Sequence, residues 1–216
     1  MAGLKCLAAV VVMALAAEAG IMSAKETKCD FPDIDLNDEV DKLLEKLPTE
    51  YSPMDSRGFR PSLLGLVVVD QNTTGLNEIK RYGPVVTYCK NGESMVQVDL
   101  INIGDVELNV PLRSCSGQEV KAILHAEFSR FTAQFLVDKD GGSGKYLALS
   151  GRSGTLPVTT YNVEFILDGL GPGGRIASVA LSKLVPQLFQ EAWTENFFPT
   201  FRGALRKALQ ENNEVF

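Results

Sequence analysis

Few residues of this sequence have the types and spacing that catalysis needs. His125 is the only histidine, and it stands inside an alternating strand pattern without a nearby nucleophile motif. A hydrolase triad is therefore nearly excluded, and a structural place on an exposed strand face is favoured. Asp138 and Asp140 flank a turn, where carboxylates are solvated, and no Cys-x-x-Cys or His-x-x-x-His pair suggests a transition-metal site. We expect no enzyme, no metal and no cofactor.

The residues with binding chemistry are apolar and lie near the C-terminus. Five aromatic side chains fall within thirteen positions, from Phe189 to Phe201. On a helix packed against a sheet they would form the wall of an apolar ligand pocket. Each of them alone is more often ordinary core, so a fully packed interior is the competing interpretation. The residues predicted to contact the ligand are Leu184, Leu188, Phe189, Trp193, Phe197 and Phe201.

The charge balance restricts the partners. The 216 residues include 21 Lys and Arg against 27 Asp and Glu, so the formal net charge is −6 and the sequence pI is about 4.9. Because nucleic-acid binding needs a positive surface, we expect no nucleic-acid partner. With 45% hydrophobic and 22% charged residues, the composition is that of a globular protein whose core needs no metal.

The first nineteen residues have the pattern of a secretory signal peptide. Lys5 supplies a basic start, an unbroken apolar run covers 7–17, and small residues at 17 and 19 give a cleavage site, with 14–16 as a second option. A membrane anchor is the weaker interpretation, because a spanning helix needs about 20 apolar residues and Glu18 interrupts this run. We predict a signal peptide over 1–19, a single domain over 20–216, secretion to the extracellular space and no stable membrane insertion.

Three cysteines would remain after cleavage, in an oxidising compartment. An odd number allows at most one bridge within the chain. Cys89 and Cys115 are the preferred pair, because both are expected near strand ends of one meander; the alternative is that no cysteine pairs. Cys29 would then be free to form a disulfide-linked dimer. Asn72 begins the only N-x-Thr sequon, in a predicted polar loop where a glycan could be attached.

The hydrophobic period predicts the elements that position these residues. A short helix is expected over 38–47, capped by Asn37 or Asp38 and ended by Pro48. From 62 to 167 the apolar residues alternate, which indicates strands, and Asn91-Gly92 favours a tight hairpin. The alternation changes parity at Arg130, as at a bulge or bend in one long strand. Strands are predicted over 64–69, 85–89, 95–100, 106–111, 120–137, 146–149 and 158–167.

The C-terminal part is predicted to be a helix over 175–212, interrupted by Pro186 and Pro199 and preceded by a glycine-rich linker over 169–174. Its apolar residues form two stripes that point apart. Either the helix kinks near Pro199, or a curved sheet covers different sides of the helix in turn. The fold class is therefore α+β, a long antiparallel sheet with a long C-terminal helix. The first stripe consists of Leu181, Leu184, Val185, Leu188 and Ala192, and the second of Phe197, Phe198, Phe201, Leu205 and Leu209.

Three segments resemble a family of lipid-binding proteins. Residues 75–83 (GLNEIKRYG) are similar to a Gly-Leu-x-x-apolar-Lys-Arg-x-Gly segment that precedes the central strands of that family. Residues 181–190 are similar to its long C-terminal helix, and Phe201, followed by basic residues and then 211–213, is similar to the end of that helix. The chain thus resembles the mite group 7 allergens of arthropods. These are single-domain relatives of the bactericidal/permeability-increasing (BPI) protein and of takeout and juvenile-hormone-binding proteins, in the tubular lipid-binding (TULIP) superfamily.

The resemblance implies a strongly curved antiparallel sheet wrapped around the C-terminal helix, with an apolar ligand bound at one end. Some features differ from the family. Cys89 and Cys115 have no counterpart in the mite subgroup, and only Cys29 remains of the N-terminal pair of the hormone carriers, which puts hormone carriage in doubt. Lys80 and Arg81 are the only candidates for the basic tip of lipopolysaccharide-binding relatives, and a solvated turn is their simpler interpretation.

The sequence therefore predicts a secreted binding protein for a lipid, fatty acid or lipopeptide, held between the sheet and the C-terminal helix. The alternative is a secreted, non-enzymatic interaction protein with a fully packed core. Such a protein would bind a host or bacterial protein, as an allergen or immune ligand does, through its acidic surface.

Overall fold

The computed structural model describes residues 29–53, 60–61, 67–68, 71–113, 117–138, 146–149 and 155–210. The predicted signal peptide, Cys115 and Asp140 lie outside these residues. The helical segments are α2 (Leu36–Glu45), the 3-10 turn η1 (Leu76–Glu78), α3 (Gly171–Leu184) and α4 (Pro186–Gln210). The strands are β1 (Glu50–Tyr51), β2 (Arg60–Pro61), β3 (Val67–Val68), β4 (Asn72–Thr74), β5 (Lys80–Arg81), β6 (Val86–Lys90), β7 (Glu93–Asn102), β8 (Glu107–Arg113), β9 (Glu119–Val137), β10 (Leu147–Ala148) and β11 (Leu156–Asp168).

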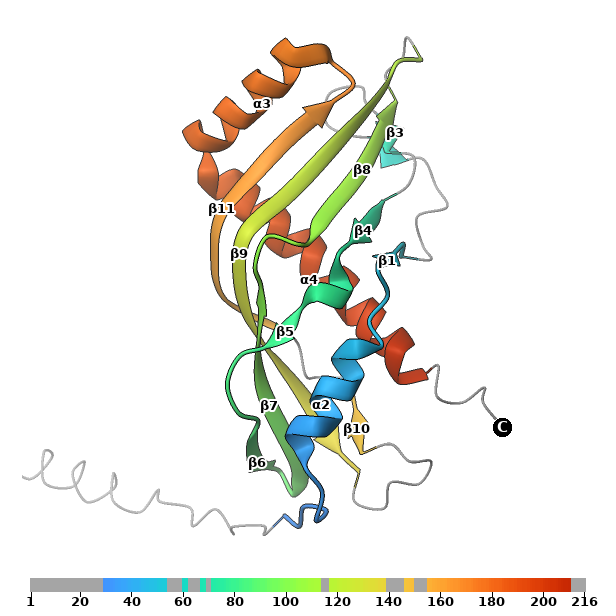
Figure 1. Cartoon of the computed structure of the whole chain (residues 1–216), viewed down its shortest axis with the longest axis vertical. Coiled ribbons are helices and arrows are strands. Elements are labelled where there is room, and N and C mark those ends of the chain that lie inside the picture. Colours follow the sequence, from blue (N-terminus) through green and yellow to red (C-terminus); the bar gives the residue numbers. More distant parts are fainter. Residues whose placement is uncertain are drawn as a thin grey trace, which may run out of the picture.

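The described strands form one antiparallel sheet organised around the long strand β9 (Figure 1). One edge of β9 pairs first with β8 and then with β7, and the other edge pairs with β11 and finally with β10. The sheet therefore has an upper half, made of β8, β11 and the first part of β9, and a lower half, made of β6, β7, β10 and the last part of β9. Figure 1 shows the two halves twisted relative to each other. The predicted α+β class with a long antiparallel sheet is confirmed.

The parity of β9 changes where the two halves meet. The buried side chains fall on even positions from Val120 to Ala126 and on odd positions from Ser129 to Val137, with Thr132 buried in addition. The change in the buried positions therefore lies at Glu127 and Phe128, shortly before the predicted Arg130. The strand bends there because its pairing partner changes from β8 to β7. The alternation that the sequence predicted on either side of the change is confirmed.

Asn102, the last residue of β7, stabilises the turn that connects β7 to β8. Its side chain is buried, and its Oδ1 accepts hydrogen bonds from the backbone N–H groups of Asp105 and Val106 at 3.1 and 3.2 Å. Its Nδ2 donates to the carbonyl oxygen of Ala126 at 3.4 Å. One amide thus satisfies backbone groups that leave the ladder at the turn.

Helix α2 closes the lower half of the core. Its cap is Asp35, whose carboxylate accepts from the Asn37 N–H at 2.9 Å, so the helix begins before the predicted Asn37 or Asp38 cap. Arg81 of β5 donates to both oxygens of Asp41, at 2.8 and 2.6 Å, and ties α2 to the sheet. This hydrogen bond lowers the pKa of the Asp41 carboxyl. Four apolar residues at helical spacing in and just after this helix are buried: Val40, Leu43, Leu44 and Leu47.

The C-terminal helix is two helices, and the break lies at Val185 rather than near Pro199. Val185 has φ −131° and ψ 59°, outside the helical region, because a residue before proline is disfavoured there. Pro186 then begins α4, at a position where its missing N–H costs nothing. Pro199 lies inside α4, which continues to Gln210. The predicted 169–174 linker is also shorter than expected, because Gly171 already begins α3.

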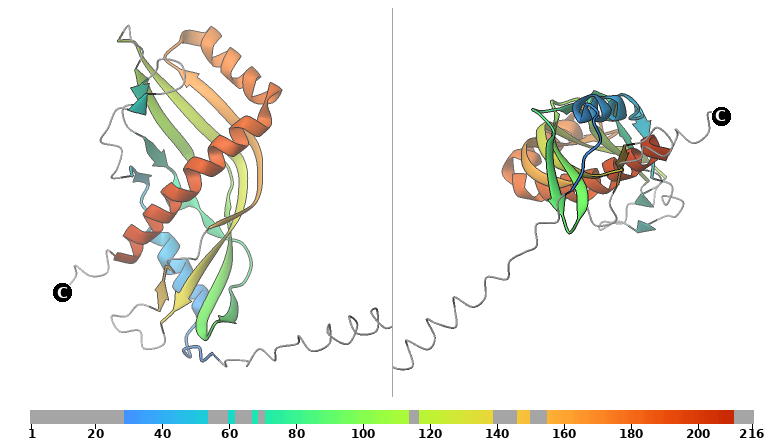
Figure 2. Two further views of the ribbon diagram at one scale, coloured as in Figure 1. Left: turned by 180° about the vertical axis from the view of Figure 1, so that it is seen from behind. Right: turned by 90° about the horizontal axis from the view of Figure 1, so that it is seen from below.

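Helix α4 runs diagonally across one face of the sheet (Figure 2). We call this side the inner face. Its residues alternate along the strands and pair across them in register. In the lower half they include Val98, Leu100 and Phe131, and in the upper half Leu108, Val110, Leu112, Val120, Ala122, Leu124, Ala126, Val163, Phe165 and Leu167.

The predicted disulfide partner of Cys89 was wrong. Cys89 is bonded to Cys29, with the two Cα atoms 5.6 Å apart. The segment before α2 lies along the β6–β7 hairpin, where Ser94 Oγ donates to the carbonyl oxygen of Asp30 at 2.7 Å and brings Cys29 beside Cys89. The predicted dimer through Cys29 is corrected as well, because its sulfur is already bonded within the chain. The hairpin is as predicted, with φ of 56° at Asn91.

Candidate functional site

The structure separates the six residues that were predicted to contact a ligand. Phe189, Trp193, Phe197 and Phe201 are buried along α4, one helical turn apart. Leu184 is 78% exposed and Leu188 58% exposed, at the junction between α3 and α4. The four aromatic residues therefore share one face of a helix, whereas the two leucines lie on the surface.

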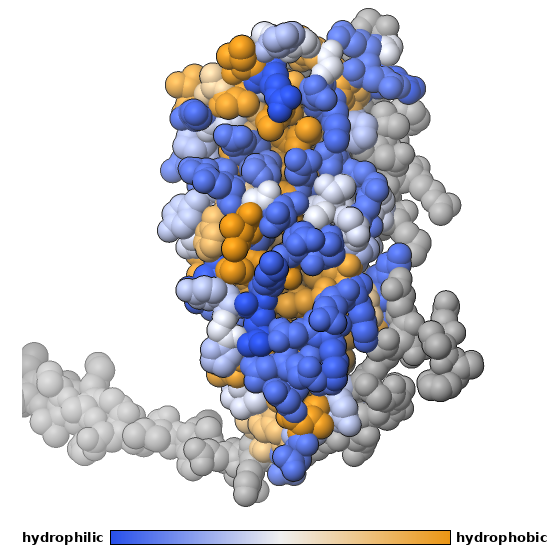
Figure 3. Space-filling model, viewed as in Figure 1, coloured by the Kyte–Doolittle hydropathy of each residue, from blue (hydrophilic) through white to orange (hydrophobic). Residues whose placement is uncertain are grey.

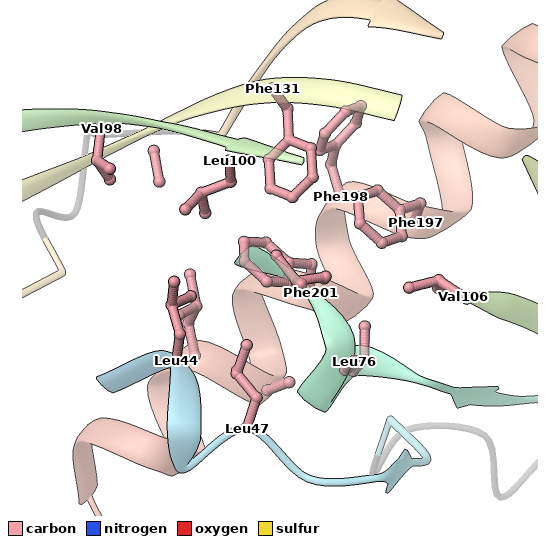
Figure 4. Packing of buried hydrophobic residues seen from close by; sticks show 14 of the residues in the cluster. Leu44, Leu47, Leu76, Val98, Leu100, Val106, Phe131, Phe197, Phe198 and Phe201 are labelled. Atoms are coloured by element: carbon pink, nitrogen blue, oxygen red, sulfur yellow. The ribbon is translucent and has the colours of Figure 1, made fainter. Parts of the chain in front are cut away.

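The aromatic residues form a filled cluster in the middle of the molecule (Figure 4). The ring of Phe131, from the central strand β9, meets those of Phe197, Phe198 and Phe201 edge-on, with centroids 5.3, 5.6 and 5.0 Å apart. Trp193 stacks on Phe197 at 4.9 Å. These are the preferred distances and angles for packed aromatic rings, so this part of the predicted wall serves as core.

The inner face becomes less covered toward its upper end. On β8, Leu108 has 0% exposure and Leu112 has 9%, and on β9, Ala126 has 0% and Leu124 has 9%. On the neighbouring strand, Phe165 and Leu167 are half-buried. Figure 2 shows why: α4 crosses the middle of the sheet, and the ends of β8, β9 and β11 extend past it. We call this region, formed by Val110, Leu112, Ala122, Leu124, Phe165 and Leu167, the open end of the inner face.

Helix α3 borders the open end and turns its polar side to the sheet. The Phe165 N–H donates to Ser182 Oγ at 2.7 Å, and the Leu167 N–H donates to Ser178 Oγ at 2.9 Å. These hydroxyls replace the strand that β11 lacks on its outer edge.

With its serines toward the sheet, α3 presents apolar side chains to the surface, and hydrophobic surface gathers over this part of the molecule (Figure 3). The large residues of the first stripe are not covered by the sheet. They are exposed, as is Ile176: Leu181, Leu184, Val185 and Leu188.

Two concave regions on α4 are more polar than the open end. A groove of about 420 Å³ is bordered by Thr155, Phe198, Pro199, Arg202, Gly203 and Arg206. A second, of about 490 Å³, is bordered by Gln187, Gln190, Glu191, Thr194 and Glu195. None of the six predicted ligand contacts borders either groove.

His125, the residue considered for catalysis, makes a hydrogen bond to the backbone. His125 is half-buried in β9, and its Nε2 donates to the carbonyl oxygen of Gly104 at 2.8 Å. Of the two basic residues considered for a tip, Arg81 binds Asp41 and Lys80 is exposed. Within the described ranges, no three side chains of His, Cys, Asp or Glu come together as metal ligands could.

The sequon lies in a strand and not in the predicted loop. Asn72 belongs to β4, is half-buried, and donates from Nδ2 to Glu50 Oε1 at 2.5 Å. A glycan would replace that hydrogen bond, and glycosylation of Asn72 stays a prediction.

Sequence reasoning missed the residues of the open end. The alternation of β8, β9 and β11 identified them as one face of a sheet, but it contains no signal for how far along the sheet α4 extends. The serine pair was a usable signal, because Ser178 and Ser182 are one helical turn apart between apolar residues.

No model of a known protein family matches the chain, and no curated protein matches it. Among the described helices, none is both long and apolar enough to cross a membrane.

Proposed function

We propose that this protein is a secreted, non-enzymatic binding protein for a small hydrophobic ligand, such as a lipid, fatty acid or lipopeptide. The ligand would lie at the open end of the inner face, between the sheet and the helices α3 and α4. The observation that supports this most is the change in burial along one continuous apolar face. The face is closed by aromatic side chains in the middle and partly exposed at the end.

In this proposal the ligand contacts only one end of the predicted aromatic wall. Phe189 belongs to that wall and also borders the open end, since its ring stacks on that of Phe165 with the centroids 4.9 Å apart. Leu184 and Leu188 precede Phe189 in the chain and are exposed, so they are available to cover a ligand. The deeper aromatic residues Trp193, Phe197 and Phe201 would form the inner boundary of the site. A ligand that buries about 300 Å² of apolar surface gains roughly 7 kcal/mol, from which the cost of association is subtracted.

The resemblance to the TULIP superfamily supports the same function. A long antiparallel sheet with a C-terminal helix across its inner face agrees with the arrangement that the resemblance implies. That the sheet wraps around α4 as in that superfamily, and that the chain is related to mite group 7 allergens, remain part of the proposal. Secretion is also proposed, and the Cys29–Cys89 disulfide supports it, because such bonds persist in oxidising compartments.

The first test is to express the full chain in a secretory host, extract the purified protein with organic solvent and analyse the extract by mass spectrometry. A stoichiometric lipid is expected. The same protein should bind phenylnaphthylamine, an environment-sensitive apolar probe, and a panel of fatty acids and lipopeptides should displace it.

A pair of variants locates the site. Ala122→Phe places a large side chain on the inner face at the open end and should weaken probe binding at least tenfold. Lys121→Phe introduces the same side chain at the adjacent position on the exposed outer face, and should bind as the wild type does. Equal binding by both variants would show that the ligand lies elsewhere.

The alternative function is an interaction protein with a fully packed interior. The filled cluster around Phe131 favours it, as do the exposed apolar side chains of α3. An empty extract together with no probe binding by the wild type would support this alternative and reject the carrier.

A further inference from the structure

Two polar side-chain atoms lie in the apolar layer between α4 and the sheet without a hydrogen-bond partner in the described part of the chain. They are Nε1 of Trp193 and Oγ1 of Thr73. Both residues have 0% exposure. Buried polar groups in proteins are nearly always hydrogen-bonded, so an N–H and a hydroxyl left unpaired in the same layer require an explanation.

Thr73 lies on the inner face, in the row of residues that borders the open end. The pairing of β4, β8, β9 and β11 sets Thr73 opposite Leu108, Leu108 opposite Leu124, and Leu124 opposite Phe165. Residues that pair in register share one face of a sheet. The Thr73 hydroxyl is therefore on the same side as Leu124 and Phe165.

Trp193 approaches this row from the helix. Phe189, which stacks on Phe165, is one helical turn before Trp193. Trp193 therefore stands on α4 between Phe189, at 7% exposure, and Phe197, at 0%. The two unpartnered groups thus come from opposite walls of the same layer, Trp193 from α4 and Thr73 from the sheet.

Both groups can donate to an oxygen atom. An indole N–H is a donor only, and a threonine hydroxyl donates or accepts. All inner-face positions described along 108–112, 120–126 and 163–167 are apolar, so these strands offer no cation to a carboxylate. An ionised carboxylate buried there would be unpaired, which is far more costly than burying a neutral carbonyl or hydroxyl that receives hydrogen bonds.

We infer that Trp193 and Thr73 form a polar subsite for a neutral oxygen of the ligand, such as that of an alcohol, ester or ketone. This inference rests on the proposed function. The oxygen enters first and accepts from Trp193 Nε1, and the hydrocarbon tail extends along Leu124 and Leu112 toward α3. The site should thus prefer a neutral, oxygenated lipid over a fatty-acid anion or a plain hydrocarbon.

The test compares ligands of equal chain length by displacement of phenylnaphthylamine: dodecanol, methyl laurate, dodecane and dodecanoate. The wild type should bind dodecanol and methyl laurate at least tenfold more tightly than dodecane, and dodecanoate more weakly than dodecanol. Trp193→Phe removes the donor and keeps an aromatic ring, and Thr73→Val removes the hydroxyl at nearly constant volume. Each variant should reduce the preference for dodecanol over dodecane about three- to tenfold, the range expected for one hydrogen bond.

Thr200→Val is the matched control. Thr200 is also buried on α4, but its hydroxyl donates to the carbonyl oxygen of Asn196 at 2.7 Å. This variant should lower the melting temperature and leave the ligand preference unchanged. Thr73→Val should instead melt at or above the wild-type temperature without ligand, because it removes an unpaired polar group.

The outcomes separate the inference from the function on which it rests. If no ligand displaces the probe from the wild type, the proposed function fails. If ligands bind but neither Trp193→Phe nor Thr73→Val changes the preference for dodecanol, the polar subsite is rejected. Tighter binding of dodecanoate than of dodecanol, lost in Trp193→Phe, would overturn the assignment to neutral lipids.

Discussion

At the scale of single residues, Gly75 shows how closely two distant turns approach in this fold. Its φ of +79° lies in the left-handed region, and a Cβ placed on it would lie 1.9 Å from the carbonyl oxygen of Asp105. Its N–H donates to the carbonyl oxygen of Thr49 at 2.9 Å. The glycine that opens the 75–83 segment is therefore needed because the backbone at 105 leaves no room for a side chain.

We predict that Gly75→Ala lowers the free energy of unfolding by at least about 3 kcal/mol, because the clash involves backbone atoms that cannot rotate away. Gly83→Ala is the control. Gly83 also has a positive φ, +86°, but a Cβ there would meet nothing within 4 Å, so the cost should be only about 1 kcal/mol. Urea unfolding of both variants measures the difference, and equal losses would show that backbone conformation alone governs position 75.

At the scale of elements, the strands could be predicted from the sequence and the last helices only in part. Period-two alternation identified the strands from 85 to 167, and the Asn91-Gly92 pair identified their hairpin, because these signals are local. The orientation of α3 is not a local property. Its apolar residues form a stripe that a sheet could cover, but Ser178 and Ser182 face the sheet instead, because they satisfy the unpaired edge of β11.

The disulfide illustrates the same limit. Cys29 and Cys89 are 60 residues apart, and only the path of the segment before α2 along the hairpin brings them together. At the candidate site, Phe189 was identified from its spacing with the other aromatic residues. The open end was not, because it depends on where α4 crosses the sheet.

We predict that Ser178→Ala and Ser182→Ala release α3 from β11 while the rest of the chain stays folded. The Leu167 and Phe165 N–H groups lose their acceptors, and each loss should cost about 1 kcal/mol or more. Amide hydrogen exchange at Phe165, Leu167 and within α3 should then be about tenfold faster. Thr194→Ala is the control, because its hydroxyl bonds only within α4, to the carbonyl oxygen of Gln190 at 2.9 Å. Unchanged exchange in both serine variants would show that other contacts hold α3.

At the scale of the whole molecule, the two halves of the sheet differ in how they are covered. The lower half has α2, the Arg81–Asp41 ion pair, the disulfide and the cluster around Phe131. The upper half has the partly exposed open end and a helix attached to the edge of β11. Stability in a protein is seldom uniform, and regions with little apolar burial open first.

We predict that hydrogen exchange without ligand divides the molecule at the bend of β9. Amides of β7 and of 131–136 in β9 should exchange only by global unfolding, whereas those of β8, β11 and α3 should exchange by local opening, at least tenfold faster.

A bound ligand would add apolar contacts only in the upper half, so a saturating ligand should slow exchange there and leave the lower half nearly unchanged, apart from any gain in global stability. Uniform protection in both halves without ligand would mean that the interior is packed throughout, as the interaction-protein alternative requires. Protection gained in the lower half alone would place the ligand against α2 and Phe131, away from the open end.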